Sequence, residues 1–328
     1  MNYPHTGLPN SLLSSCFADP EISVNSGQMF LWQKFDNSWY GVYGDHILKF
    51  SILGHNNKFS ILGHNNKGAN EYDNVEFFSF PEFNNWERHV FRLDDDIKNI
   101  LSGFSKDSIL SKAIRMYPGL RVMRQDPNQC MISFACASNT NISMIRRMLS
   151  NICRKFGDPV IVDGKEFFTF PKADRLNKAT TSEIVSCGVG YRVKAIKAVA
   201  DSIDSKDIDI DYLKHARYNA SKEELLKIYG IGNKIADCIL LFSLEKLEAF
   251  PIDVWITRAL SLYYRWLLNE NKIEKDNKQR TLKTDEKLLY RYKYEMLSEA
   301  IRTYFGKYAG YAQQYLFYYI RHKAARKW

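Results

Sequence analysis

The chain has 328 residues, which is long for one hydrophobic core and typical of two domains that pack together. Apolar residues make up 45% and charged residues 25%, a globular balance that excludes disordered, collagen-like and low-complexity chains. No apolar run approaches the roughly 18 residues of a membrane span, because the best candidate, 238–256, is interrupted by charged side chains. The N-terminus lacks the basic start and apolar core of a signal peptide, so we expect an intracellular protein.

The net charge points to an anionic partner and to one half of the chain. Lys and Arg number 46 against 37 Asp and Glu, which gives a formal charge of +9. Residues 1–114 carry a net charge of −4 and the remainder carries +13. We therefore expect the anion-binding surface in the second half.

Residues 1–114 predict a β-rich domain. The segments 28–35 and 39–50 are aromatic and β-branched, and turn residues at 36–37 and 44–45 interrupt them. This pattern predicts strands and hairpins up to about residue 80, followed by a short helical stretch at 96–114.

The nonapeptide FSILGHNNK occurs twice in this domain, at 50–58 and 59–67. Two copies are too few for a solenoid, so we interpret the repeat as a duplication that lengthened a strand or a loop. Its histidines, His55 and His64, have no clustered carboxylate beside them. No metal site is therefore predicted there.

Residues 115–328 predict a helical domain. Asp126 before Pro127 is an N-cap signal for a helix that runs to about Ala137. After a turn at 138–141, apolar spacing marks one face of a second helix, which Gly157 ends. The polar, lysine-rich stretch 271–291 is interpreted as a solvated insertion.

Residues 221–258 predict a helix–hairpin–helix. Ser221 and Glu224 are spaced as a capping box that starts the first helix. That helix is expected to end at Gly230-Ile231-Gly232, where two glycines permit positive φ, and a second helix begins at once. Backbone N–H groups at such a turn can bind an anion such as a DNA phosphate. An ordinary helical hairpin has the same turn, so the turn alone leaves both interpretations open.

Three side chains in and after this hairpin suggest chemistry. Lys234 lies in the first turn of the second helix, where the helix dipole disfavours its ammonium form, and a neutral amine can form a Schiff base. Cys238 lies four residues later, on the same helix face. Asp253 has the position of an N-cap, and its carboxylate can also stabilise a positive charge. A solvated lysine and a simple cap are the alternatives.

The motif G-I-G-x-K-x-A-D-C at 230–238, followed by F-P-I-D at 250–253, resembles the helix–hairpin–helix DNA glycosylases, and within them the 8-oxoguanine DNA glycosylase/AP lyases. Further matching segments cover nearly the whole chain: SGQMFLW at 26–32, RQDPNQC at 124–130, SFACASNTN at 133–141, GVGYR at 188–192 and YAGYAQQYLF at 308–317. The resemblance implies an α+β fold, with an N-terminal antiparallel β-rich (TBP-like) domain before an all-α helix–hairpin–helix glycosylase region. It also implies a monomer that acts on duplex DNA containing 8-oxoguanine, without a cofactor or a catalytic metal.

The resemblance also implies a mechanism. Lys234 would attack C1′ of the damaged nucleotide and displace the base, and the resulting Schiff base would permit β-elimination 3′ to the lesion. Asp253 would stabilise the oxocarbenium-like transition state.

By the same resemblance, Phe317 and Cys238 would stack on the two faces of the flipped base, and Gln313 would contact its Watson–Crick edge. The carbonyl of Gly27 would accept a hydrogen bond from N7–H, a proton that only the oxidised purine carries. One such bond discriminates by roughly 1–3 kcal/mol. On their own, Phe317 is more simply a core aromatic and Gln313 a surface amide.

Asn139 and Tyr191 match the residues that fill the gap in the duplex, and Arg192 matches an arginine that contacts the orphaned cytosine. For Tyr191 the alternative is a core tyrosine. Met144 and Trp255 depart from the animal and yeast enzymes, which carry a second cytosine-reading arginine and a phosphate-side histidine there. Both departures resemble the bacterial and archaeal branch, and we predict a weaker preference for cytosine opposite the lesion.

The cysteines separate this chain from related classes. Its six cysteines include no C-x-x-C pair and none after Cys238, so neither a zinc ribbon nor the iron–sulfur cluster of endonuclease III-like enzymes is predicted. Buried or free thiols are expected instead. Alkylbase glycosylases lack the catalytic lysine. The alternatives are another helix–hairpin–helix glycosylase with a different base specificity and a non-catalytic DNA-binding protein.

Overall fold

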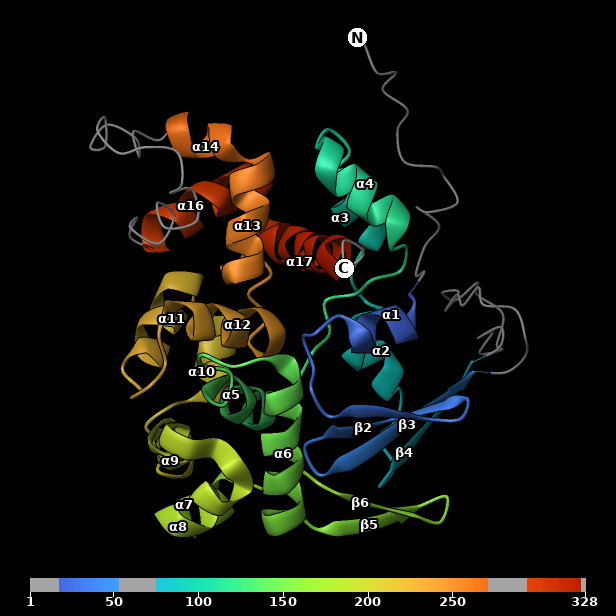
Figure 1. The fold of residues 1–328 in the computed structure, drawn as a ribbon, viewed down its shortest axis with the longest axis vertical. Helices are drawn as coiled ribbons and strands as arrows, with labels where there is room; N and C mark the ends of the chain where they lie inside the picture. Colours follow the sequence, from blue (N-terminus) through green and yellow to red (C-terminus); the bar gives the residue numbers. More distant parts are fainter. Residues whose placement is uncertain (1–17, 53–74, 271–293, 326–328) are drawn as a thin grey trace.

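The computed structural model describes residues 18–52, 75–270 and 294–325. An antiparallel sheet formed by the N-terminal part of the chain lies beside a larger group of helices (Figure 1). The predicted α+β class is confirmed. No helix in these ranges is both long enough and apolar enough to cross a membrane.

Helix α1 (Pro20–Asn25) precedes a four-stranded sheet of order β1-β2-β3-β4. Its strands are β1 (Trp32–Phe35), β2 (Ser38–Tyr43), β3 (His46–Ile52) and β4 (Val75–Phe80). Both predicted turns connect paired strands, and Asp36 and Gly44 in them have positive φ, as tight hairpin turns require. Apart from residues 50–52 in β3, the FSILGHNNK repeat lies outside the described residues.

Alternate residues of a strand point to opposite faces of the sheet. In β2 and β3, residues on both faces are buried. Tyr40, Val42 and Ile47 belong to the large core that includes most of the helices. Leu48 and Phe50 belong to a smaller, aromatic-rich core on the other face. The sheet therefore joins the helical part through one face.

The helical stretch predicted at 96–114 is present as two helices, α3 (Ile97–Ser102) and α4 (Ser108–Met116). Asp96 and Asp107 cap them through their carboxylates. Before them lies α2 (Trp86–Val90), which the sequence did not predict. Five residues are too few for a helical period, and the buried indole of Trp86 fixes this helix by packing.

The two helices predicted after residue 126 are α5 (Pro127–Ala135) and α6 (Ile142–Phe156). Asp126 caps α5 by accepting from the backbone N–H of Gln129 at 2.8 Å, and α6 ends at Gly157, as predicted.

The expectation that residues 115–328 are all helical is wrong at one place, because α6 leads into the hairpin β5 (Pro159–Val162) and β6 (Lys165–Phe168). Phe167 stacks on Tyr40 at a ring distance of 5.0 Å, and the Tyr40 hydroxyl donates to Asp163 at 2.6 Å. The hairpin thus packs against the N-terminal sheet, and its four-residue strands are too short to show a period in the sequence.

The other helices follow in chain order, with a π-helical turn at Val185–Val189. They are α7 (Ala173–Lys178), α8 (Thr181–Ile184), α9 (Val193–Asp204), α10 (Ile210–His215), α11 (Tyr218–Leu226), α12 (Asn233–Ser243), α13 (Val254–Tyr263), α14 (Arg265–Glu270), α16 (Tyr294–Phe305) and α17 (Ala309–Ala325). Helix α17 packs against both α4 and α13, so the end of the chain joins the two parts (Figure 1). The insertion expected at 271–291 lies outside the described residues.

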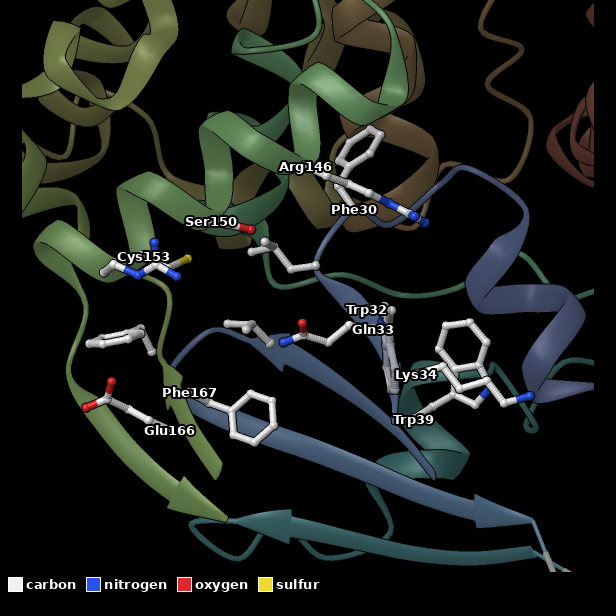
Figure 2. Close-up of a pocket in the computed structure, with 14 residues that line it drawn as sticks. Phe30, Trp32, Gln33, Lys34, Trp39, Arg146, Ser150, Cys153, Glu166 and Phe167 are labelled. Carbon is white, nitrogen blue, oxygen red and sulfur yellow. The ribbon is translucent and has the colours of Figure 1, made fainter. Parts of the chain in front are cut away.

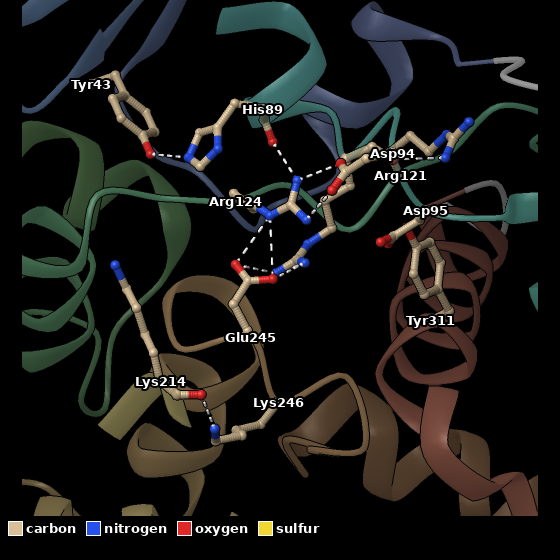
Figure 3. A network of polar contacts seen from close by, with 11 residues as sticks. Tyr43, His89, Asp94, Asp95, Arg121, Arg124, Lys214, Glu245, Lys246 and Tyr311 are labelled. Carbon is tan, nitrogen blue, oxygen red and sulfur yellow. Dashed lines mark hydrogen bonds and ion pairs between the residues drawn. The ribbon is translucent and has the colours of Figure 1, made fainter. Parts of the chain in front are cut away.

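A network of ion pairs joins the residues after α12 to the N-terminal part (Figure 3). Arg92, whose side chain is fully buried, donates to Glu245 at 2.6 Å. Arg124 bonds Asp94 at 2.6 Å and Glu245 at 3.1 Å. We call these four residues the clamp. Because Glu245 lies two residues after the last residue of α12, the clamp holds the C-terminal end of that helix.

Candidate active site

The hairpin between α11 and α12 has the predicted helix–turn–helix form. Gly230 has φ +87°, a conformation that favours glycine. A β-carbon there would also overlap the methyl group of Ala195, so two separate reasons require glycine at this position. Of the two glycines that permit positive φ in this turn, only Gly230 uses it. Gly232 has φ −95° and is the N-cap of α12, a conformation open to any residue.

The predicted capping box is wrong. Helix α11 begins at Tyr218, ahead of Ser221, whose hydroxyl donates to the carbonyl of Leu213 at 2.8 Å. Glu224 pairs with Lys227 and caps nothing. The buried Tyr218 bonds Asp237 and so anchors the helix start by a tertiary contact that local spacing cannot show.

Lys234 and Asp253 lie on neighbouring elements at the N-terminal end of α12. Lys234 is in the first turn of α12, with its ammonium nitrogen 5.8 Å from the ring centre of Phe134. Asp253 accepts from the backbone N–H of Ile256 at 2.8 Å, which confirms it as the N-cap of α13. Burial raises the pKa of Asp253 above 3.8, against the opposing effects of that hydrogen bond and of the Lys234 charge. The half-buried carboxylate is therefore partly desolvated, and the nearby Lys234 cation stabilises its charged form.

Cys238 is 4% exposed, one turn beyond Lys234. Burial raises the pKa of its thiol to about 12, although the Lys234 charge acts in the opposite direction. The side chain is thus a neutral apolar surface that suits stacking. The other described cysteines are also buried free thiols, as expected: Cys130, Cys136, Cys153 and Cys187.

Asp237, three residues after Lys234 on α12, is fully buried and is linked by hydrogen bonds to the residues before Asp253. Its carboxylate accepts from the hydroxyls of Tyr218 at 2.5 Å and Tyr294 at 2.7 Å, and it pairs with Lys222 at 3.1 Å. The Tyr294 oxygen also accepts from the backbone N–H of Ile252 at 3.0 Å. Through this one hydroxyl, α12 is joined to the segment that holds the Asp253 carboxylate.

Phe317 and Gly27 meet although they come from opposite ends of the chain, and Gln313 lies one turn before Phe317 on α17. Gln313 is 5% exposed and donates to the carbonyl of Pro251 at 3.2 Å, so it is no surface amide. Its Oε1 is buried and has no hydrogen-bond partner in the described structure. A β-carbon on Gly27 would lie 3.2 Å from Cε1 of the half-buried Phe317, and Gly27 has φ +85°.

Asn139, Tyr191 and Arg192 form a cluster in which Asn139 and Tyr191 are exposed and Arg192 is half-buried. Tyr191 is 64% exposed, which excludes a core tyrosine, and its hydroxyl donates to the carbonyl of Ser138 at 3.2 Å. The Arg192 guanidinium lies 4.5 Å over the Tyr191 ring and donates to the carbonyls of Ser138 and Asn139. An exposed aromatic beside a guanidinium is available to a partner surface.

The two positions that depart from the animal and yeast pattern differ in their exposure. Met144 is 41% exposed on α6. Trp255, in the first turn of α13, carries the Arg258 guanidinium 5.2 Å from its ring centre. Met144 is therefore accessible to a partner, whereas Trp255 is half-buried.

Two family models match adjacent parts of the chain. The model of the 8-oxoguanine DNA glycosylase N-terminal domain matches residues 15–131, and that of the HhH-GPD superfamily of base excision DNA repair proteins matches 132–283. The chain belongs to the 8-oxoguanine DNA glycosylase family within the HhH-GPD superfamily.

Curated relatives and a solved structure agree with this family. The chain is 32% identical over 243 residues to the N-glycosylase/DNA lyase of Saccharomyces cerevisiae and 33% identical over 229 residues to that of Arabidopsis thaliana. These alignments cover 69% and 67% of this chain and 64% and 58% of the relatives, so the chain spans less than two thirds of their length. A Clostridium acetobutylicum 8-oxoguanine glycosylase/lyase, solved with double-stranded DNA containing cytosine opposite 8-oxoguanine, has a TM-score of 0.74 at 29% identity, covering 94% of this chain and 93% of that one.

This member of the glycosylase family also has a cavity of about 530 Å³ between α6, β1 and β6 (Figure 2). Aromatic and charged side chains line it, among them Phe30, Trp32, Arg146, Glu166 and Phe167. None of the predicted site residues lies in its wall, so the candidate active site is elsewhere. In the described ranges, no three His, Cys, Asp or Glu residues gather to hold a metal ion.

Sequence reasoning missed three residues: Asp237, Arg321 and Tyr294. Asp237 lies in the K-x-A-D-C motif, and its position as a carboxylate on an otherwise apolar helix could have identified it from the sequence. Arg321 lies four residues after Phe317, a spacing that places both on one helix face. Tyr294 had no signal in the sequence, because its role depends on where α16 packs.

Proposed function

We propose that this chain is a bifunctional enzyme that excises 8-oxoguanine from duplex DNA and cuts the strand at the resulting site. The observation that carries the proposal is the placement of Lys234 in the first turn of α12 near the half-buried carboxylate of Asp253. Such a pair supplies a nucleophile and a counter-charge at one place. The family, and the substrate and activity named for the Clostridium acetobutylicum protein, support the same proposal.

In the proposed reaction, the Lys234 amine attacks C1′ of the flipped nucleotide, and the N-glycosidic electron pair leaves with the base. Loss of the amine proton and opening of the sugar give a Schiff base between Nζ and C1′. Removal of a C2′ proton then expels the 3′ phosphate, which is the β-elimination. The Asp253 carboxylate stabilises the positive charge that develops on the sugar as the base departs.

The base is proposed to stack between Phe317 and Cys238, with Gln313 at its Watson–Crick edge and the Gly27 carbonyl at N7–H. The unpartnered Gln313 Oε1 supports this assignment, because a buried acceptor without a donor is available to a ligand.

On the DNA side, Asn139, Tyr191 and Arg192 are proposed to fill and read the space that the flipped base leaves. The hairpin at Gly230 and Gly232 is proposed to contact a backbone phosphate, which adds affinity without sequence selectivity. The net charge of +13 outside residues 1–114 supports binding to a polyanion. We further propose a monomer without a cofactor, which acts where genomic DNA lies: the nucleoid of a prokaryote or the nucleus of a eukaryote.

Borohydride trapping on a duplex with one 8-oxoguanine tests this function. The protein should form a covalent adduct and cut the strand, and Lys234→Gln should lose both. Lys227→Gln is the matched control, since Lys227 is an exposed lysine of the same hairpin paired with Glu224. Tight binding with neither adduct nor cleavage would favour a non-catalytic DNA-binding protein. Excision of a different base would favour another glycosylase of the superfamily.

The exposed Met144 supports a further expectation, a weak preference for cytosine opposite the lesion. Excision rates measured opposite each of the four bases should differ by about tenfold or less, which is roughly the effect of one hydrogen bond. A strict dependence on cytosine would contradict this expectation.

A further inference from the structure

Arg321, which none of the predicted roles uses, has a buried donor beside Gly27. It lies on α17 with its guanidinium carbon 5.7 Å from the ring centre of Phe317. Its Nη1 would be 2.9 Å from a β-carbon on Gly27. This nitrogen is buried and has no acceptor among the described residues. A guanidinium donor therefore points at the two residues proposed to frame the base.

The electrostatic surroundings of Arg321 make this arrangement costly in the free protein. Burial lowers the pKa of Arg321, the Arg146 charge acts in the same direction, and Tyr318 and Asp253 oppose it. Arg146 also has a buried Nε without an acceptor in the described part. Guanidinium groups keep their proton in proteins, so the unmet donor cannot be relieved by deprotonation. A ligand oxygen at this point would remove the cost.

Resting on the proposed function, we propose that Arg321 is a specificity-determining residue whose Nη1 donates to a carbonyl oxygen of the flipped base. The N7–H of 8-oxoguanine lies between two such oxygens, O6 and O8. If the Gly27 carbonyl accepts from N7–H, a donor beside Gly27 faces one of these oxygens. Guanine lacks O8 and the N7 proton but carries O6, so a bond from Nη1 to O8 favours the oxidised base directly, whereas a bond to O6 holds the base with its N7 edge at the Gly27 carbonyl.

A backbone phosphate is the other acceptor that a guanidinium commonly binds. The observations favour the base, because Nη1 is buried against Gly27 and Phe317, whereas phosphates are bound at accessible nitrogen atoms. A contact of Arg321 to the base and a contact to a phosphate predict different results at an abasic site, because that site keeps its phosphates and has no base.

The test compares two activities of the same variant. Arg321→Met should lower kcat/KM for 8-oxoguanine excision about 10- to 100-fold, the effect of one charge-assisted hydrogen bond. Cleavage of a preformed abasic site should stay within about twofold of wild type. Arg88→Met, which removes an exposed arginine from α2, is the matched control and should change neither. An equal loss of both activities, or no loss of excision, would overturn the proposal. Failure of the wild type to excise 8-oxoguanine would instead overturn the proposed function.

A second measurement assigns the oxygen. In the Lys234→Gln background, the affinity for duplexes with 8-oxoguanine or 8-oxoadenine is compared with and without Arg321→Met. An equal loss for both bases places the bond at O8, which both carry. A loss confined to 8-oxoguanine places it at O6, which 8-oxoadenine lacks. No loss for either base would contradict the contact.

Discussion

The two ends of α12 use polar groups in opposite ways. At its C-terminal end, the clamp pairs Glu245 with both Arg92 and Arg124. At its N-terminal end, Lys234 acts on Asp253, whose charge burial disfavours, and near Asp253 the atoms Gln313 Oε1 and Arg321 Nη1 are buried without hydrogen-bond partners in the described structure. Buried polar groups that are hydrogen-bonded stabilise the fold. Buried polar groups without a hydrogen-bond partner lower its stability and are available to a substrate. One helix thus joins a structural end to a binding end.

The largest effect is expected at the binding end. Asp253→Asn should lower the excision rate about 10²- to 10³-fold, since it removes a preorganised charge from the transition state. Its stability should not fall. The pKa of Asp253 is raised on folding, so ionisation of the aspartate destabilises the fold as the pH rises above about 3.8, and asparagine caps equally well.

Rates on an 8-oxoguanine duplex and thermal unfolding at pH 7 measure the two effects of Asp253→Asn. Asp209→Asn is the matched control, because Asp209 caps α10 through the backbone N–H of Tyr212 and has no role in the proposed chemistry. A melting temperature well below that of wild type would contradict the account of Asp253.

At the clamp, Glu245→Gln should lower the free energy of unfolding by about 2–3 kcal/mol. This is less than the 3–5 kcal/mol of a fully buried pair, because the Glu245 side chain is 39% exposed. Burial acts to raise the pKa of Glu245, but the Arg92 and Arg124 charges outweigh it and hold the pKa below 4.5. The pairing is therefore complete above pH 4.5 and is lost as the pH falls through the lowered value.

Denaturant unfolding at several pH values tests this, and the difference between wild type and Glu245→Gln should shrink in acid. Glu224→Gln removes the exposed pair with Lys227 and should cost less than about 0.5 kcal/mol. Equal costs for the two variants would show that the clamp is no stronger than a surface pair.

Gln313→Met tests the role of Gln313 Oε1, the buried acceptor without a hydrogen-bond partner in the described structure. Excision should fall about 10- to 100-fold, or 1–3 kcal/mol, because the base loses a hydrogen-bond partner. The free energy of unfolding should change by less than about 1 kcal/mol, since the variant removes an unsatisfied oxygen together with one donor to Pro251. Cleavage of an abasic site should be nearly unchanged. A large loss of stability would instead make Gln313 a structural residue.

The smallest effect is expected where α12 is joined to the segment that holds Asp253. Tyr294→Phe removes the hydroxyl shared by Asp237 and Ile252 and should cost about 1 kcal/mol of stability. It should also lower kcat a few-fold with KM nearly unchanged, because Asp253 is held less firmly. Tyr304→Phe loses a longer, exposed bond to Asp107 at 3.2 Å, so it should cost less stability and leave kcat unchanged. A kcat equal to that of wild type in Tyr294→Phe would contradict the positioning role.

Local signals in the sequence predicted much of this molecule. The turns at Asp36 and Gly44, the caps at Asp126 and Asp253 and the hairpin at Gly230 all depend on residues next to one another in the chain. Predictions failed where a distant contact decided the outcome. Tyr218 starts α11 early because it bonds Asp237, and the β5–β6 hairpin exists because Phe167 packs on Tyr40.

The sequence by itself determined the family, the two charge regions and the identity of the candidate Lys234, because these follow from motifs and composition. Only the tertiary structure decided which buried groups are paired. The sequence is the same whether or not the side chains of Gln313 and Arg321 have hydrogen-bond partners. Their state depends on the packing of α17 against residues from the start of the chain, and burial makes an unmet hydrogen bond costly enough to matter.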